Sequence, residues 1–374
     1  MIAEIITSMY GIKDAVDFDK VKKVLVIKLR HHGDVLLSSP VFQVLKNHHP
    51  DLQIDALVYQ DTQDMLTLNP AINQVRTIDR NWKKLGLNGQ FHKELELLKQ
   101  LKSESYDLII HLTEHWRGAI ISRYIKPAYS VCAKYPRRNS ALWKGSFTHH
   151  YPIPSKPRHT VEKHLDSLRR IGILPSQLER SLSLIPGTDA EQFREKILEE
   201  HKVDNYILIH PTSRWLFKCW ENRKFSALID ELSNELSENN TCIILTAAPA
   251  NNELVMIEEI IQHCGANVIN LSGKLNLKQL AAFIETAQLF IGVDSVPMHM
   301  ASAFNTPCIA LFGPSGDLEW GPLSNNSIII TSNHSCRPCG LDGCGSSKVS
   351  DCLTSITVEE VLSACKAKLN NGSQ

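Results

Sequence analysis

A carboxylate at position 34 stands where a catalytic base would be expected. Gly33 and Asp34 lie between an apolar run at residues 24–29, which predicts a strand, and residues 35–46, which predict a helix. An aspartate there would be an ionised group at the carboxyl end of a strand, ready to accept a hydroxyl proton. The same position favours Asp as an ordinary helix N-cap, and the sequence leaves both interpretations open.

A second polar group follows the predicted strand at residues 206–209. It comprises Thr212, Ser213 and Lys218, and a helix is predicted after it at residues 223–236. Hydroxyl groups and an ammonium suit a diphosphate, whose departure from a sugar needs positive charge and hydrogen-bond donors when no metal assists. A solvated loop lysine is the simpler alternative, but the adjoining hydroxyl pair favours binding.

Asp294 and Ser295 form a third group, between the predicted strand at residues 289–293 and a helix with Pro297 in its first turn. Free amides at a helix start hold phosphate, so Ser295 would bind phosphate while Asp294 orients the donors or a ribose hydroxyl. Both residues are also suited to be plain helix caps. His299, one turn further, is included among the donor-binding candidates, although histidines at such positions are more often packed.

Four cysteines near the C-terminus are candidate metal ligands. They are spaced C-x2-C-x4-C-x7-C and are Cys336, Cys339, Cys344 and Cys352. The second spacing is tighter than in most structural zinc sites and free thiols need no metal, so zinc is left open and no cofactor is predicted. Acidic side chains within residues 1–20 are unlike a secretory signal, so we expect reduced thiols and a cytosolic protein.

These groups need a scaffold of parallel strands. Short apolar runs alternate with amphipathic stretches through both halves, the pattern of βαβ units around a buried parallel sheet. The first half predicts strands at residues 24–29, 53–58, 75–78 and 107–112, and a helix at 161–170. The second half predicts strands at residues 206–209, 241–245, 268–271, 289–293 and 308–312. Each strand of the second set runs into a small or polar loop, where ligands of open parallel sheets bind.

The chain is too long, at 374 residues, for one ordinary core. Proline and basic residues crowd residues 134–158, which we expect to be irregular. The connection from Pro175 to Pro186 predicts a boundary between domains 1–180 and 181–374. Residues 1–185 hold 27 basic and 18 acidic side chains, which leaves 13 and 22 of the balanced 40 and 40 for the remainder. The first half either attracts an anionic ligand or merely differs in surface charge.

Missing motifs narrow the chemistry. No G-x-G-x-x-G and no P-loop sequence follows a predicted strand, which argues against nicotinamide and ATP-hydrolysing enzymes. The Asp17-Phe18-Asp19 motif precedes the first strand, where it is badly placed to hold a metal diphosphate. A metal-dependent transferase is therefore disfavoured, and the balanced total charge disfavours a nucleic-acid partner.

Four segments together resemble the ADP-heptose:lipopolysaccharide heptosyltransferases of glycosyltransferase family 9: residues 28–37, 212–220, 292–301 and 311–314. The resemblance spans most of the chain and implies an α/β GT-B fold, with two Rossmann-like domains whose parallel sheets face a central cleft. It implies that domain 1–180 binds the acceptor and domain 181–374 the nucleotide sugar. Residues 111–118 and the cysteine cluster are most similar to the third inner-core enzyme of this family, which adds the side-branch heptose.

The resemblance also assigns roles to residues. Asp34 matches the family's base. The implied donor contacts are Thr212, Ser213 and Lys218 for the diphosphate and Glu253 for the ribose. Asp294 and Ser295, at the start of a helix, are implied as further donor contacts. Lys218 would stabilise the leaving diphosphate and so take part in catalysis. Val296 and Pro297 depart from the family pattern, because many relatives have glycine first at this turn.

The implied activity is inverting, metal-independent transfer of L-glycero-D-manno-heptose from ADP-heptose to a heptose of the lipopolysaccharide inner core. Such an enzyme is expected in the cytoplasm, in peripheral contact with the inner membrane. Because that core is rich in phosphate and carboxylate, Arg117, Arg137 and Arg138 are candidate acceptor contacts, with solvated surface arginines as the alternative. The rival functions are a nucleotide-sugar epimerase, a transferase for another nucleotide sugar, and a non-catalytic sensor.

Overall fold

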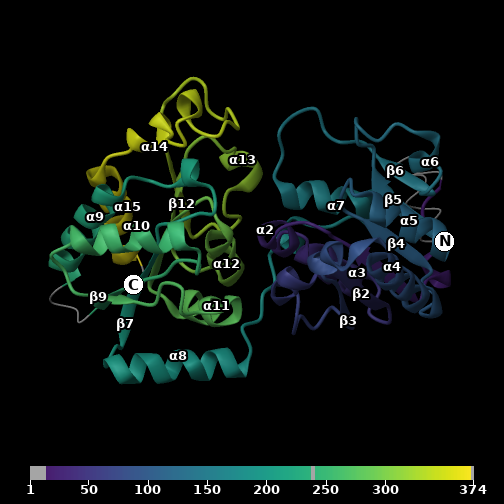
Figure 1. Ribbon diagram of the computed structural model, residues 1–374, viewed down its shortest axis with the longest axis horizontal. Coiled ribbons are helices and arrows are strands. Elements are labelled where there is room, and N and C mark those ends of the chain that lie inside the picture. Colours follow the sequence, from purple (N-terminus) through teal and green to yellow (C-terminus); the bar gives the residue numbers. More distant parts are fainter. Residues whose placement is uncertain (1–13, 237–240, 372–374) are drawn as a thin grey trace. The chain divides into compact units, whose positions relative to one another are not determined.

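The protein is built from two compact units, Met1–Ser183 and Leu184–Gln374. The computed structural model describes residues 14–236 and 241–371, and Figure 1 shows the elements of both units. The sequence places the boundary between residues 180 and 181, three residues before the observed division. Among the described residues, no helix combines the length and the apolar character that crossing a bilayer requires.

Unit 1 contains a six-stranded parallel sheet in the order β3-β2-β1-β4-β5-β6. Its strands are β1 (Lys23–Ile27), β2 (Gln53–Tyr59), β3 (Gln74–Ile78), β4 (Leu108–His111), β5 (Tyr129–Ala133) and β6 (His149–Tyr151). The α-helices are α2 (His32–Leu36), α3 (Ser39–His48), α4 (Gly86–Ser103), α5 (Trp116–Ile125), α6 (Ala141–Lys144) and α7 (Thr160–Arg170). The 3-10 helices are η1 (Phe18–Lys20), η2 (Gln60–Met65), η3 (Arg80–Leu85) and η4 (Gln177–Arg180).

Two expectations for unit 1 are wrong. The single helix predicted at residues 35–46 is two helices, α2 and α3, which meet at Leu37 and Ser38. Pro40 is the reason, because proline lacks the N–H that a continuous helix needs but fits the first turn of a new one. The stretch at residues 134–158 is not wholly irregular, since it contains α6 and β6. The edge strand β6 has only three residues, too few for a periodic pattern to be visible.

Unit 2 contains a second six-stranded parallel sheet in the order β12-β11-β10-β7-β8-β9. Its strands are β7 (Asn205–His210), β8 (Thr241–Leu245), β9 (Val268–Asn270), β10 (Leu289–Val293), β11 (Cys308–Phe312) and β12 (Ser327–Thr331). The α-helices are α8 (Thr188–His201), α9 (Asn222–Leu236), α10 (Asn251–Gln262), α11 (Leu277–Thr286), α12 (Val296–Phe304), α13 (Asp317–Trp320), α14 (Asp351–Thr354) and α15 (Val358–Asn371). The 3-10 helices are η5 (Leu216–Lys218) and η7 (Cys344–Ser346).

The two sheets have the same topology. In each sheet the first strand lies beside the fourth, β1 beside β4 and β7 beside β10, and the strand order runs outward from that pair in both directions. This is the doubly wound arrangement of Rossmann-like domains, in which ligands bind beyond the carboxyl ends of the strands at the point of reversal. The predicted fold class, α/β with two Rossmann-like domains and parallel sheets, is confirmed.

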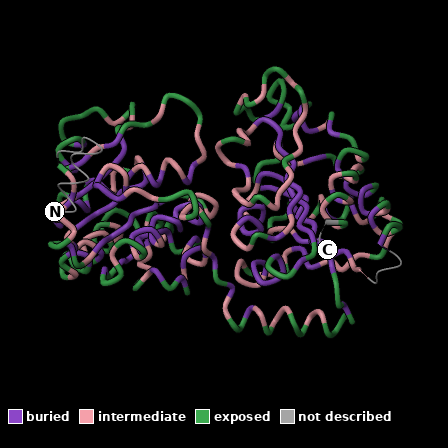
Figure 2. Tube along the Cα trace, turned by 180° about the vertical axis from the view of Figure 1, so that it is seen from behind, coloured by how far each residue is buried: buried purple, intermediate pink, exposed green. Residues whose placement is uncertain are grey.

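The strands form the core of each unit. Figure 2 shows buried residues concentrated along the strands and exposed residues on the surrounding helices and loops. A buried cluster of unit 2 joins apolar side chains of β7, β8, β10 and β11 to those of α9, α10 and α15. Burial on both faces explains why these strands read as continuous apolar runs, without the alternation of a half-exposed strand.

Candidate active site

The carboxyl ends of β7 and β10 bring together residues that are far apart in the sequence. These strands are hydrogen-bonded neighbours at the point where the order of the second sheet reverses. Thr212 and Ser213 follow β7, whereas Asp294 and Ser295 follow β10. Four of the predicted donor-binding residues therefore lie around the switch point where doubly wound sheets bind their ligands.

Lys218 and Asp294 form an ion pair at this point. Lys218 ends η5, and its Nζ lies 2.6 Å from Asp294 Oδ2. The Asp294 side chain is 7% exposed and that of Lys218 is 21% exposed, so water screens the pair only partly. Asp294 is thus a counter-ion rather than a helix cap. Since an ammonium has three donors, Lys218 retains capacity for an anionic ligand.

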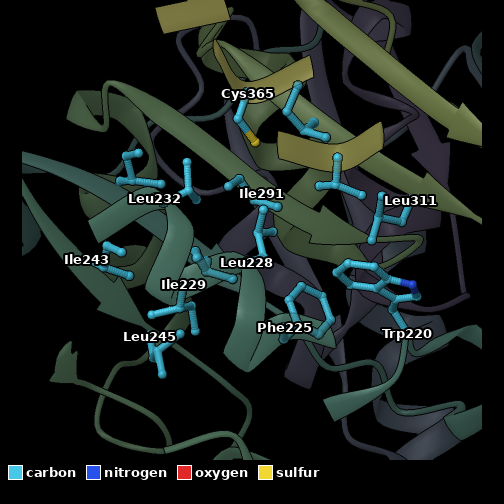
Figure 3. Packing of buried hydrophobic residues seen from close by; sticks show 14 of the residues in the cluster. Trp220, Phe225, Leu228, Ile229, Leu232, Ile243, Leu245, Ile291, Leu311 and Cys365 are labelled. Carbon is cyan, nitrogen blue, oxygen red and sulfur yellow. The ribbon is translucent and has the colours of Figure 1, made fainter. Parts of the chain in front are cut away.

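Trp220 anchors the loop that carries Lys218. Its indole lies in the hydrophobic core of unit 2, where it meets Phe225 edge-on with the ring centroids 5.0 Å apart (Figure 3). Its Nε1 donates a hydrogen bond of 3.1 Å to Ile356 O. A buried indole with its N–H satisfied gives a fixed attachment two residues after the lysine.

Glu253 lies beside Thr212, in the helix that follows the neighbouring strand β8. It belongs to the first turn of α10 and is buried, with 4% exposure. Its Oε2 accepts a hydrogen bond of 2.6 Å from Thr212 Oγ1 and one of 3.4 Å from the Ala248 N–H. Buried carboxylates need such donors, because burial removes their hydration. The resemblance alone indicated Glu253, and the structure places it next to a second predicted donor contact.

The start of α12 leaves amide groups free of side-chain capping. Ser295 occupies the N-cap position, but its hydroxyl donates to Val293 O at 3.3 Å and makes no capping bond. The amides of the first turn therefore keep their capacity for another acceptor, such as a phosphate oxygen. Pro297 in that turn has no N–H to offer. His299 is buried within α12, as a packed histidine would be.

Asp34 lies in unit 1, within the first turn of α2. The helix begins at His32 and its N-cap is His31, so the interpretation of Asp34 as an ordinary N-cap is wrong. Its side chain is 15% exposed, and its Oδ1 lies 3.6 Å from Lys28 Nζ and 3.9 Å from Arg30 Nε. The helix N-terminus and the two cations all favour negative charge here. Sequence reasoning did not single out Lys28 as a site residue. The feature that could have indicated it is a lysine at the end of an otherwise apolar run.

The three candidate acceptor arginines differ in their surroundings. Arg117 holds Glu94 with two donors, Nε at 3.0 Å from Oε2 and Nη2 on Oε1, and its side chain is only 14% exposed. Arg138 Nε donates to Glu114 O at 2.8 Å. Arg137 is exposed in the loop after β5. The ion pair of Arg117 is therefore a structural contact, and Arg137 is the one best placed to meet a ligand from solution.

The cysteine cluster offers no metal geometry. All four thiols are free, Cys336 and Cys344 are exposed and Cys352 is buried. Burial raises the pKa of Cys352, so its thiol is neutral in the absence of a metal. In the part of the chain that the structure describes, no three His, Cys, Asp or Glu side chains are grouped so as to hold a metal ion. Zinc at this cluster gains no support.

Comparison with known proteins identifies the family. Residues 95–349 match the model of glycosyltransferase family 9 (heptosyltransferase). The chain belongs to glycosyltransferase family 9. This family 9 chain is 39% identical, over 301 residues, to lipopolysaccharide heptosyltransferase 3 of Escherichia coli, and the match covers 80% of the chain and 86% of that relative. The resemblance read from four segments, and the expectation of a glycosyltransferase, are thereby confirmed.

Solved structures of the family have the same fold. The family 9 glycosyl transferase from Veillonella parvula superposes with a TM-score of 0.81 at 20% identity, covering 96% of this chain and 99% of that one. The E. coli heptosyltransferase WaaC with ADP-2-deoxy-2-fluoro heptose gives a TM-score of 0.68 at 17% identity, covering 92% and 99%. The two Rossmann-like domains expected of a GT-B fold in this family 9 enzyme are therefore confirmed.

Proposed function

We propose that this chain transfers L-glycero-D-manno-heptose from ADP-heptose to a heptose of the lipopolysaccharide inner core, with inversion and without a metal. The observation that carries the proposal is the ion pair of Lys218 and Asp294 at the switch point of the second sheet, beside Thr212 and Glu253. It is supported by the relative named lipopolysaccharide heptosyltransferase 3 and by the WaaC structure with an ADP-heptose analogue.

Unit 2 supplies what a nucleotide-sugar donor requires. Lys218 gives a fixed positive charge, Thr212 and Ser213 give hydroxyl groups, and the first turn of α12 gives amide donors. As the bond between the anomeric carbon and the diphosphate breaks, its electron pair moves to the leaving oxygen. Charge on that oxygen is stabilised by donors already in place, the task that a metal performs in other transferases. Glu253, through its bond to Thr212, orients one of these donors.

Asp34 of unit 1 is the proposed base. It accepts the proton of an acceptor hydroxyl while the hydroxyl oxygen forms a bond to the anomeric carbon from the face opposite the diphosphate. ADP leaves as the anion, and the configuration at the anomeric carbon inverts. The position of Asp34, 3.6 Å from the Lys28 ammonium, suits a side chain that must act as a carboxylate in the reaction.

Acceptor binding is proposed for unit 1. Arg137 and Arg138 lie in the loop after β5, and Arg137 is exposed to a phosphorylated or carboxylated core. Arg117 is already paired with Glu94 and serves as a structural contact. We also propose that the enzyme works on the cytoplasmic face of the inner membrane. Exposed side chains that suit contact with an anionic lipid surface are Lys83, Lys84, Leu85, Leu87 and Phe91.

The deciding experiment measures ADP release from ADP-heptose, with and without a heptose-containing core acceptor, in buffer containing a chelator. Wild type, Asp34→Ala and the exposed control Asp51→Ala are compared. We expect acceptor-dependent release that Asp34→Ala abolishes and Asp51→Ala retains. Release that ignores the acceptor would favour an epimerase or hydrolase, and no release would favour another donor sugar or a sensor. Loss of activity with the chelator would refute metal independence.

A further inference from the structure

A buried lysine lies at the centre of a polar cluster in unit 1. Lys28 directly follows β1 and is 5% exposed. Its Nζ donates to Leu112 O at 3.2 Å, lies 2.8 Å from His164 Nε2, and is 3.6 Å from Asp34 Oδ1. The three donors of the ammonium thus have three neighbours, on β4's outgoing loop, on α7 and on α2. A lysine buried without such partners would be strongly destabilising.

His164 has its tautomer set by its neighbours. Its Nδ1 lies 2.9 Å from Leu37 O, and a carbonyl only accepts, so Nδ1 carries the hydrogen. Burial, and then the charge of Lys28, hold the pKa of His164 well below its usual range, so the ring is neutral. Nε2 then has a lone pair that accepts from the Lys28 ammonium. Leu37 is the C-cap of α2, so His164 binds both Lys28 and the helix that carries Asp34.

The Lys28 ammonium keeps its charge at neutral pH. Burial lowers the pKa of Lys28 from 10.5 to about 8, and the Asp34 carboxylate opposes that change. Arg30 is also close to Asp34, at 3.9 Å, but its side chain is 56% exposed and water screens it. Lys28 is therefore the cation that acts most directly on Asp34.

We propose that Lys28 and His164 are positioning residues for Asp34: His164 fixes the Lys28 ammonium, and the ammonium holds one oxygen of Asp34 so that the other faces the acceptor hydroxyl. The inference rests on the proposed role of Asp34 as base. A carboxylate held by a fixed cation on one oxygen loses rotational freedom before the reaction, which lowers the barrier to proton transfer from an aligned hydroxyl. Neither positioning residue needs to touch the sugar.

The chain offers a matched pair of variants at position 164. In His164→Gln, the amide oxygen reaches the place of Nε2 and accepts from Lys28. In His164→Asn, the shorter amide reaches only the place of Nδ1, so it serves Leu37 O and leaves Lys28 without its acceptor. The two variants are similar in polarity and differ in the contact that the proposal requires. Lys28→Met removes the ammonium and keeps a chain of similar length.

The test is steady-state kinetics of transfer, from about pH 5 to about pH 9, for these three variants. We expect Lys28→Met and His164→Asn to lower kcat at least about tenfold, because the Asp34 carboxylate has lost the fixed cation that orients it. His164→Gln should keep most of kcat. The KM for ADP-heptose should stay within about twofold in all three, because the proposed donor contacts lie in unit 2. The charged and titratable groups around this cluster are Lys28, Arg30, Asp34, His111, Tyr135, His159, Lys163 and His164.

Tyr106→Phe is the control for a lost buried hydrogen bond in the same sheet. It removes the 2.6 Å bond from Tyr106 Oη to Asp55 Oδ2 and should lower the melting temperature without changing the pH profile. The proposal is overturned if Lys28→Met, or His164→Asn where Lys28→Met does not fold, matches the wild-type kcat. Equal activity of His164→Asn and His164→Gln would also overturn it. If instead Asp34→Ala retains transfer, the proposed base is wrong, whatever position 164 does.

Discussion

Lys218 Nζ lies 2.6 Å from Asp294 Oδ2, although the two residues are 76 positions apart in the chain. The contact joins the loop after β7 to the loop after β10, which are adjacent only because of the strand order. In the free protein, Asp294 neutralises the positive charge of Lys218. The proposed mechanism uses that same charge to stabilise the leaving diphosphate. Donor binding must therefore share the Lys218 ammonium between a carboxylate and a phosphate, so the pair both positions the lysine and moderates its affinity for ADP.

Lys218→Met is expected to lower kcat by about 100-fold or more, because it removes a charged donor from the oxygen that gains charge as ADP leaves. Lys218→Arg should recover part of the loss. The measurement is ADP release at saturating ADP-heptose, with KM determined in parallel. Asp294→Asn serves as the comparison: freeing the ammonium should tighten binding of the product ADP. Unchanged kcat in Lys218→Met would remove this residue from the mechanism.

Thr212→Val and Glu253→Met should each weaken donor binding by about tenfold, because each variant breaks the same 2.6 Å hydrogen bond. Since the two side chains act through one contact, the double variant should cost clearly less than the sum of the two single variants. Calorimetric titration with ADP measures all four proteins. Additive losses would mean that the two residues act separately and that Glu253 does not orient Thr212.

Gly118→Ala should destabilise unit 1. A Cβ at this position would lie 2.1 Å from Cε1 of the buried His111 ring, so the ring or α5 must move. Forcing an extra methyl group into a filled core costs about 1–3 kcal/mol. Gly265→Ala is the control, since its Cβ would meet Asp230 Oδ1 at an ordinary 3.7 Å. Thermal melting followed by circular dichroism compares the two, and equal melting temperatures would contradict the tight packing of Gly118.

Acid should destabilise unit 2 partly through His210. Burial lowers the pKa of His210 from 6.5 to about 4. The unfolded chain therefore binds a proton that the folded protein does not between these values, and stability falls as the pH drops from 6.5 toward about 4. The full effect is at most about 3 kcal/mol for one such group. Below about pH 4 both states are protonated and the contribution stops changing.

His210→Asn tests this pH dependence. Its amide can still meet Thr246 Oγ1, which lies 3.0 Å from His210 Nδ1, but it does not titrate. Urea midpoints measured between about pH 7 and about pH 4 should fall less steeply than in wild type. The variant His263→Asn, at an exposed position, should follow the wild-type curve. Parallel curves for wild type and His210→Asn would exclude His210 as a source of acid sensitivity.

The sequence by itself determined the fold class and indicated the residues of the proposed donor site. Apolar runs mark all five predicted strands of the second half to within about two residues, because burial on both faces of a parallel sheet leaves a strong local signal. The polar loops after those strands could be recognised for the same reason, since they interrupt that signal. What escaped was short or locally ambiguous: β5, the three-residue β6 and β12 were not predicted, and Pro40 divided a helix that looked continuous.

Only the tertiary structure decided which side chains meet. The local sequence of Asp34 suits a helix cap or a base, and the N-cap at His31 excludes the first of these. Arg117 looks like any basic surface residue until its ion pair with Glu94 is seen. His164 reaches Lys28 across 136 positions. The periodicity of apolar residues indicates which face of a helix or strand is buried. Contacts between distant residues depend instead on strand order and helix placement, which arise from packing of the whole unit.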